Sequence, residues 1–181
     1  MNTTSTPQTN ATSLADKKNN EDDFDAAKLI ENWQQVSEQM AQASVQGQRQ
    51  KEDITLLAVS KTKPAKMIAT LARQGQHDFG ENYLQEAIEK IQALRQQPDY
   101  EHIVWHYIGS IQRNKTRDIA EHFDWVQTLE REIIAKRLHE QRPAELPALN
   151  VLIQVNIDNE DSKSGCLPAE LPDLISAIKD Y

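Results

Sequence analysis

A lysine closes a short apolar segment in the first half of the chain, and its primary amine suggests covalent chemistry. The segment is TLLAVSKTKP, residues 55–64, in which Lys61 ends the apolar run and Pro64 begins a new segment. Side chains alternate between the faces of a strand, so Leu57, Val59 and Lys61 are expected to share one face. An amine that an apolar floor partly withdraws from water is a better nucleophile, because its uncharged form is favoured. Such an amine forms Schiff bases with aldehydes.

The aldehyde partner of this amine is either a sugar carbonyl or the cofactor pyridoxal 5′-phosphate (PLP). The alternative is an ordinary solvated lysine at the end of a strand, since lysine side chains are mostly exposed. A second amine, Lys163 in the segment SKSG, is expected in a solvated loop that turns at Gly165.

Further polar residues follow the next two apolar segments. Asn82 is suited to hydrogen-bond a ring substituent of a ligand, and Glu81 sets the charge beside it. His106 lies within an expected strand, where a packed and hydrogen-bonded histidine is more typical than a catalytic one. Gly109 allows a close approach of the backbone, and Ser110 offers a hydroxyl donor. These residues form one candidate site if their strands lie side by side.

Apart from these residues, few sequence motifs indicate a binding or catalytic role. Gln112, Asn114 and Lys115 precede an expected helix, where they either bind an anion or cap the helix. The sequence holds no Walker loop and no G-x-G-x-x-G motif, and its histidines lack the spacing of metal ligands. Cys166 has no adjacent histidine, which argues against a thiol nucleophile.

These residues depend on an alternation of strands and helices. An amphipathic helix from Asp25 comes first, with an apolar stripe at helical spacing that is typical of a helix covering a core. Five strand–helix units follow, which predicts a parallel sheet wound as an open sheet or a barrel. In both, the chemistry gathers at the carboxyl ends of the strands. The strands are expected at residues 55–61, 77–82, 103–110, 124–129 and 150–157, each followed by a helix.

Composition limits the class of protein. The chain of 181 residues has a net charge of −8, which argues against a general nucleic-acid binder. Its single cysteine excludes an intrachain disulfide framework and fits the cytoplasm, and no segment is apolar enough for a membrane helix. Residues 1–23 are polar and are expected to form a disordered tail, which leaves residues 24–181 as one domain.

Four segments together resemble the pyridoxal phosphate homeostasis protein family, also called the YggS or proline synthase co-transcribed family. They occur in the order and spacing of that family and place about residues 28–181 within the resemblance. The segments are LLAVSKTKP (56–64), FGENYLQEA (79–87), WHYIGSIQRNK (105–115) and LIQVNIDNEDSKSG (152–165).

The resemblance implies a fold like the barrel domain of bacterial alanine racemases, a (β/α)8 TIM barrel of which about five βα units are present. It implies that Lys61 is the Schiff-base lysine and that PLP lies at the carboxyl ends of the strands. It also implies that Asn82, His106 and Gly109 belong to the cofactor site. Ile111 stands where the family generally has leucine, which is a conservative change.

The family continues beyond the position of Tyr181 with three further strands, a Gly-Met-Ser segment and an Arg-Ile-Gly-Thr segment that grip the cofactor phosphate. The sequence ends before them, so an incomplete barrel is expected. The resemblance predicts a PLP-binding protein that stores, buffers or delivers the cofactor, with PLP-dependent apoenzymes as possible recipients. A monomer without nucleic-acid or membrane partners is expected.

Two alternatives stay open. The first is a PLP-dependent amino-acid racemase or another lysine-dependent lyase on the same scaffold, for which His106 and Tyr107 are the nearby acid–base candidates. The second is a truncated fragment without function, because an opened barrel exposes strand edges and its apolar interior.

Overall fold

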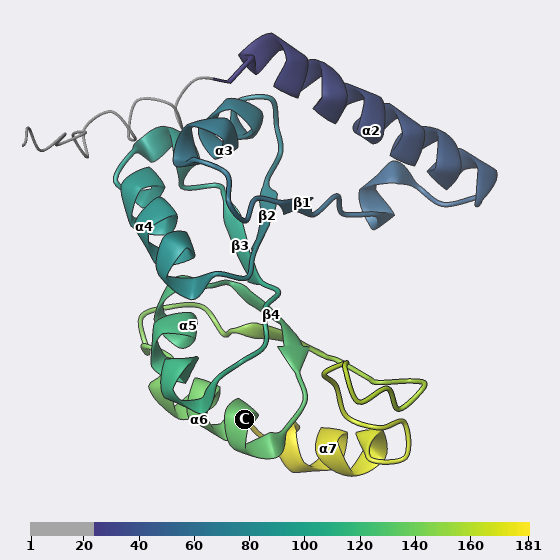
Figure 1. Cartoon of the computed structure of the whole chain (residues 1–181), viewed down its shortest axis with the longest axis vertical. Coiled ribbons are helices and arrows are strands. Elements are labelled where there is room, and N and C mark those ends of the chain that lie inside the picture. The colour runs from purple at the N-terminus through teal and green to yellow at the C-terminus, as the bar shows by residue number, and fades with distance from the viewer. Residues whose placement is uncertain (1–23) are drawn as a thin grey trace, which may run out of the picture.

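A computed structural model describes residues 24–181, so the expected tail at residues 1–23 lies outside the described part. One parallel sheet organises this part, and its strands follow one another in space as they do in the sequence. Parallel neighbours of this kind require a crossover between strands, which the helices provide. The strands are β1 (Ala58–Val59), β2 (Asp78–Glu81), β3 (Val104–Tyr107), β4 (Trp125–Leu129) and β5 (Asn150–Ile153) (Figure 1).

A helix precedes the first strand and another follows each strand, as the alternation predicts. Asp25 caps the first helix, because its carboxylate accepts a hydrogen bond from the backbone amide of Lys28. Short 3₁₀ turns at Lys51–Asp53, Pro98–Tyr100 and Arg113–Lys115 lie in the connections. The helices are α2 (Ala26–Gln46), α3 (Ala65–Ala72), α4 (Leu84–Arg95), α5 (Thr116–His122), α6 (Glu132–Gln141) and α7 (Leu171–Ile178).

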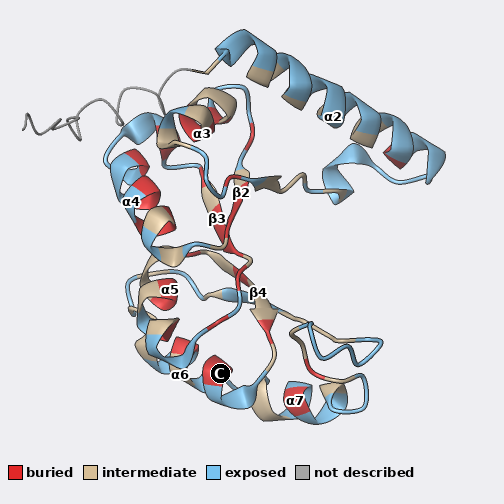
Figure 2. Cartoon of the chain, in the orientation of Figure 1, coloured by how far each residue is buried: buried red, intermediate tan, exposed pale blue. Residues whose placement is uncertain are grey.

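The core lies between one face of the sheet and helices α3 to α6. Phe79 and Trp105 are partners in the β2–β3 register and are each 1% exposed, and Val126 on β4 is fully buried. Figure 2 shows buried residues along the strands and on the sides of these helices that face the sheet. This face is the outer face of the sheet, and its burial positions the strands that carry the candidate site.

The opposite, inner face carries Val59, Gly80, His106 and Trp125. These residues are successive register partners across β1 to β4. The register confirms that Val59 lies on this face. Lys61 follows β1 in a turn, so its place on the same face stays a prediction from the alternation of side chains along a strand.

The strand expected at 103–110 is reduced to β3, Val104–Tyr107, although it has a neighbour on each side, and two further expected strands are also shortened. The strand expected at 55–61 is reduced to β1, and the one expected at 150–157 ends at Ile153, with only an isolated bridge from Val155 to Cys166 beyond it. Both are edge strands among the described residues, so each has a neighbour on one side only. A strand with one neighbour has half the ladder hydrogen bonds to define its ends.

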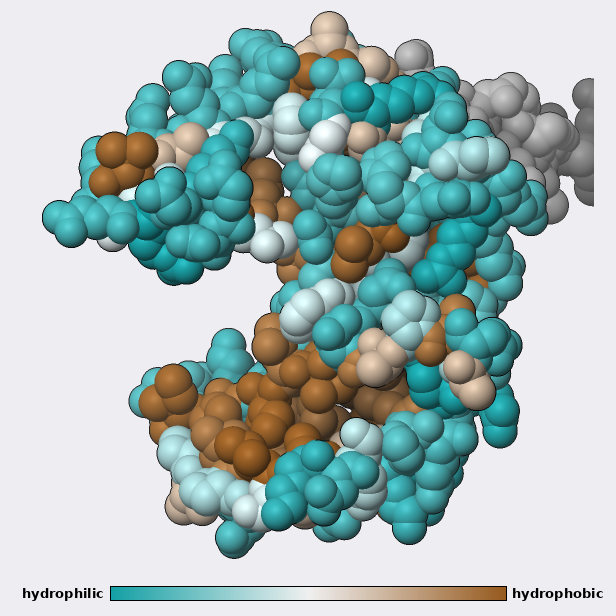
Figure 3. Space-filling view, turned by 180° about the vertical axis from the view of Figure 1, so that it is seen from behind, coloured by the Kyte–Doolittle hydropathy of each residue, from teal (hydrophilic) through white to brown (hydrophobic). Residues whose placement is uncertain are grey.

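Hydrophobic side chains gather on the surface near β5 and α7. Val151, Leu152 and Ile175 are between 39% and 48% exposed. Figure 3 shows this apolar surface on the lower part of the molecule, below a hollow that separates it from the upper part. Within residues 24–181, no helix has the length and hydrophobicity needed to cross a membrane.

Candidate functional site

Lys61 lies in a tight turn that directly follows β1. The amide of Lys63 donates to the carbonyl of Ser60 at 3.0 Å, which closes a four-residue turn around Lys61 and Thr62. The Lys61 side chain is exposed, and Val59 next to it on the inner face is 52% exposed. The expected apolar floor that withdraws this amine from water is therefore not present among the described residues. The amine is open to a ligand in solution.

Asn82 follows β2 at the same edge of the sheet. Val59 is the register partner of Gly80, and Lys61 and Asn82 each follow two positions further on, beyond the ends of their strands. The side-chain oxygen Oδ1 of Asn82 is buried and has no hydrogen-bond partner among the described residues. An unpaired buried acceptor is unfavourable, so this amide is suited to a ligand that supplies a partner.

Gly109 follows β3 and lies against the backbone of Asn82. A Cβ atom at this position would lie 2.8 Å from the carbonyl oxygen and 3.1 Å from the Cα atom of Asn82. Thr128 on β4 donates its hydroxyl to the carbonyl of Gly109 at 2.6 Å. The absent side chain thus lets the ends of β2 and β3 approach each other, and it positions Asn82.

His106 lies on the inner face as the register partner of Gly80, which is two residues before Asn82. Its Nε2 atom is 2.8 Å from the Asp78 carboxylate, and its Nδ1 atom is 3.0 Å from the side-chain nitrogen of Gln127. The ring stacks on Trp125 with 5.6 Å between the centroids. The histidine is 5% exposed, so both nitrogens have partners within the chain. This environment matches the packed and hydrogen-bonded alternative for His106.

A buried ion cluster lies behind the turn, on the outer face. Lys90 of α4 donates to the Ser60 carbonyl at 2.9 Å and to the Glu81 carboxylate at 2.8 Å, and it contacts the Glu86 carboxylate. Ser60 also donates its hydroxyl to Glu81 at 2.6 Å. Glu81 is fully buried, and its Oε2 atom has no partner among the described residues.

The sequence analysis identified Glu81 but missed the rest of this cluster. Its one local signal is the spacing of Glu86 and Lys90, four residues apart on a helix, which commonly marks an ion pair. Because such pairs are usually solvated, the spacing alone does not predict a buried ammonium. Ser60 and Glu81 join the cluster only through the packing of α4 on the sheet.

The segment SKSG lies next to the end of β3. The hydroxyls of Ser164 and Ser110 are 3.4 Å apart, and Gln154 donates to the Ser164 carbonyl at 2.8 Å. Lys163 itself is exposed, as expected. These contacts bring the loop that carries Lys163 beside Ser110, one residue from Gly109.

The residues before α5 form a 3₁₀ turn, Arg113–Lys115, and make no side-chain capping bond. The capping alternative for Gln112, Asn114 and Lys115 is therefore wrong. Among residues 24–181, no group of three or more His, Cys, Asp or Glu side chains is arranged to hold a metal ion.

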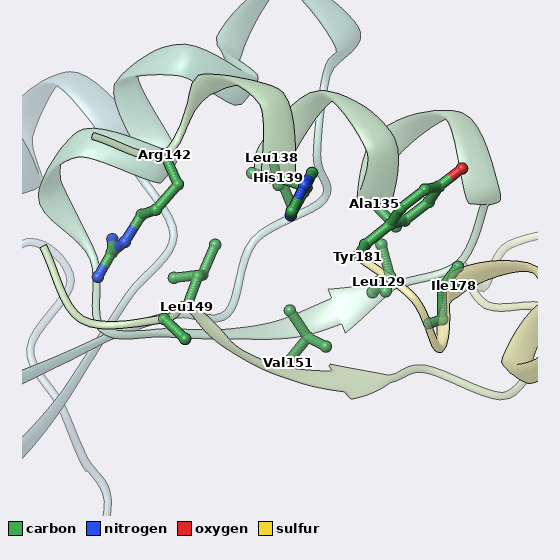
Figure 4. Close-up of a pocket in the computed structure, with 10 residues that line it drawn as sticks. Leu129, Ala135, Leu138, His139, Arg142, Leu149, Val151, Ile178 and Tyr181 are labelled. Atoms are coloured by element: carbon green, nitrogen blue, oxygen red, sulfur yellow. The ribbon is translucent and has the colours of Figure 1, made fainter. Parts of the chain in front are cut away.

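A separate apolar pocket of about 150 Å³ lies between α6, β4, β5 and the end of the described chain (Figure 4). None of the four candidate residues lines it. Arg142 at its margin donates to the carbonyls of Ala120, Phe123 and Pro147 at 2.6 to 2.8 Å. Desolvation lowers the pKa of Arg142 from its ordinary value, and the nearby charge of Asp124 opposes that shift. Because three carbonyls already hold the Arg142 guanidinium, this pocket is not suited to the phosphate of a cofactor.

The outer layer of helices and the polar side chains at the carboxyl ends of parallel strands define an α/β fold of the TIM-barrel type. The chain belongs to the family described as alanine racemase, N-terminal domain, whose sequence profile matches residues 24–181. The fold class predicted from the sequence is confirmed by this match and by the parallel sheet.

Curated relatives point to one branch of that family. The chain is 51% identical over 152 residues to the pyridoxal phosphate homeostasis protein of Escherichia coli (strain K12). It is 50% identical over 151 residues to the protein of the same name from Pseudomonas aeruginosa. These alignments cover 84% and 83% of this chain. The resemblance drawn from the four sequence segments is confirmed. The chain spans about 64% of the length of both relatives.

Solved structures with the same fold include PipY of Synechococcus elongatus PCC7942, determined without PLP and with PLP bound. The TM-scores are 0.61 and 0.56, at 35% and 36% identity. The alignments cover 78% and 75% of this chain, and 65% and 63% of the PipY chains. A protein of Bifidobacterium adolescentis has a TM-score of 0.75 at 27% identity, over 88% of this chain and 68% of its own.

Proposed function

We propose that the chain binds PLP through Lys61 and serves in PLP homeostasis as a store, buffer or carrier of the cofactor. The observation that carries the proposal is the exposed primary amine of Lys61 at the same edge of the sheet as Asn82, whose buried side-chain oxygen lacks a partner among the described residues. The relatives named pyridoxal phosphate homeostasis protein and the PLP-bound structure of PipY support it.

The residues of the site fit an aromatic aldehyde. When bound, PLP would supply an aldehyde with which the Lys61 amine can condense, with loss of the aldehyde oxygen as water. Lys61 provides the amine, and Asn82 provides an amide for hydrogen bonding to a ring substituent. Gly109 keeps that amide in place through its contact with the Asn82 backbone. His106 lies deeper on the inner face, where it stacks on Trp125.

The surroundings of His106 favour a carrier over a racemase. An acid–base residue needs a nitrogen that is free to exchange a proton with the substrate. Both nitrogens of His106 are within hydrogen-bonding distance of Asp78 and Gln127. Tyr107, the other candidate, belongs to the outer face, where it is 4% exposed and packs edge-on against Phe123.

We also propose the recipients, the oligomeric state and the compartment for this function. The recipients are PLP-dependent apoenzymes, and the carrier acts as a monomer in the cytoplasm. The single cysteine, Cys166, is a buried free thiol, which is compatible with a reducing compartment. Transfer of PLP from the loaded chain to an apoenzyme, together with the sedimentation of the chain alone, tests this part of the proposal.

The central experiment is to mix the chain with PLP, record the visible absorbance band of the lysine adduct, reduce with borohydride and map the modified residue. We expect one major site at Lys61. The Lys61→Ala variant should lose the band, whereas Lys63→Ala, two positions away in the same exposed turn, should keep it. The absence of a band, or labelling spread over surface lysines, would refute PLP binding by Lys61 in this chain.

A further inference from the structure

The two residues that flank Lys61 are both held by the buried cluster behind the turn. Ser60 accepts a hydrogen bond from Lys90 on its carbonyl and donates its hydroxyl to Glu81. On the other side, the amide of Thr62 donates to the Glu86 carboxylate at 2.7 Å. Glu86 also contacts Lys90, so a single connected group of side chains fixes both neighbours of Lys61.

The turn itself has an unfavourable backbone conformation. Thr62 has a φ of 62°, in the left-handed region that β-branched residues rarely adopt. The third residue of a four-residue turn of this kind is usually glycine or asparagine, which tolerate positive φ. Threonine is held there by surrounding contacts, and the bond from its amide to Glu86 is a contact that would be lost if the turn relaxed.

We infer that Glu86, supported by Lys90, is a positioning residue that fixes the direction in which Lys61 presents its amine. The inference rests on the proposed function, since it assigns a purpose to the geometry around the reactive lysine. It concerns a site on the outer face, so Glu86 acts through the backbone of Thr62 and does not touch the ligand. Lys63 follows Thr62 at the end of the turn, where its amide donates to the Ser60 carbonyl, and it is one residue beyond the contact with Glu86.

The position of Glu86 makes a mild substitution possible. Its side chain is 36% exposed, in contrast to the buried Glu81, so its replacement is compatible with folding. Glu86→Ala removes the acceptor for the Thr62 amide, whereas Glu86→Gln keeps an oxygen acceptor and removes only the charge. Thr62→Asn introduces a residue that adopts positive φ more readily, so it should restore the turn in the absence of Glu86. Glu89→Ala changes an exposed carboxylate on the same helix and is the matched control.

The test measures the ratio of labelling at Lys61 to labelling at Lys63. One arm uses PLP with borohydride trapping, and a second arm uses formaldehyde with cyanoborohydride, which needs no cofactor site. Glu86→Ala should lower the ratio about tenfold in the PLP arm, because only a fraction of molecules then holds the arrangement that meets the bound ligand. In the formaldehyde arm the ratio should change less than about twofold, because a small aldehyde reacts with an exposed amine in any direction. Glu86→Gln and Glu89→Ala should stay within about twofold of the wild type, and Thr62→Asn should restore most of the loss in Glu86→Ala.

Two results would overturn the inference. One is a ratio in the PLP arm for Glu86→Ala that matches the Glu89→Ala control. The other is a loss that Thr62→Asn does not restore and that follows a fall in the thermal unfolding midpoint, which would indicate a structural role only. A wild-type chain that PLP does not label at Lys61 refutes the proposed function and the inference with it, whereas wild-type labelling with an unchanged ratio in Glu86→Ala refutes the inference alone.

Discussion

Removing the ammonium of Lys90 should have a large effect on stability that depends on pH. In Lys90→Met the stem of the side chain is replaced at similar volume, but the Glu81 carboxylate loses its cationic partner. Glu81 is fully buried and would keep only the Ser60 hydroxyl, at 2.6 Å. Breaking a buried pair by removing one partner costs about 3–5 kcal/mol, because it leaves an uncompensated buried charge.

An independent argument gives the same magnitude. A buried carboxylate without a partner can avoid the cost of its charge by taking up a proton. Free glutamate titrates near pH 4.3, so protonation at pH 7 costs about 4 kcal/mol, and at pH 5 only about 1 kcal/mol. The deficit of Lys90→Met relative to the wild type should therefore shrink by about 2–3 kcal/mol when the pH falls from 7 to 5.

The assay is urea unfolding followed by tryptophan fluorescence at the two pH values. Adding Glu81→Gln to Lys90→Met should recover much of the lost stability and remove its pH dependence, because no buried charge remains. Lys136→Met is the control, since Lys136 forms only an exposed pair with Glu140 at 3.8 Å and should cost less than about 1 kcal/mol. A deficit in Lys90→Met that is equally small, or that is the same at both pH values, would refute the reasoning.

Three further outcomes follow from single contacts. Gly109→Ala places a Cβ atom 2.8 Å from the Asn82 carbonyl and should destabilise the chain by about 1–3 kcal/mol; an unchanged thermal midpoint would contradict that packing. Burial raises the pKa of Tyr107 above its ordinary value of 10.0, so ionisation of Tyr107 favours the unfolded state. The stability that the neutral Tyr107 contributes is therefore fully present below about pH 10 and is lost as the pH rises further. In Tyr107→Phe this loss should be absent from alkaline unfolding curves. Trp33→Phe removes the 2.9 Å hydrogen bond from Trp33 to Gln76, which links α2 to the rest of the domain. The loss should cost about 1–2 kcal/mol of stability and speed amide exchange in α2. Unchanged exchange would show that the bond is dispensable.

The elements and their order could be predicted from the sequence because their signals are local. Apolar runs of strand length alternate with helical spacing, and a parallel sheet follows from that alternation. The ends of the strands could not be predicted, because they depend on where the hydrogen bonding between neighbouring strands stops; even the central strand expected at 103–110 is reduced to Val104–Tyr107. For β5 the expected residues 150–157 shrink to Asn150–Ile153, and its pairing with β4 is irregular between Val126 and Leu129.

Within the candidate site, the sequence by itself determined that Lys61 stands just after the first strand, because the end of an apolar run is a local signal. Only the tertiary structure decided what surrounds that lysine. Gly109 meets Asn82 across two strands, and Lys90 reaches Ser60 over 30 positions of sequence. Such contacts arise from the packing of a helix on a sheet, and no local pattern encodes which side chains meet there.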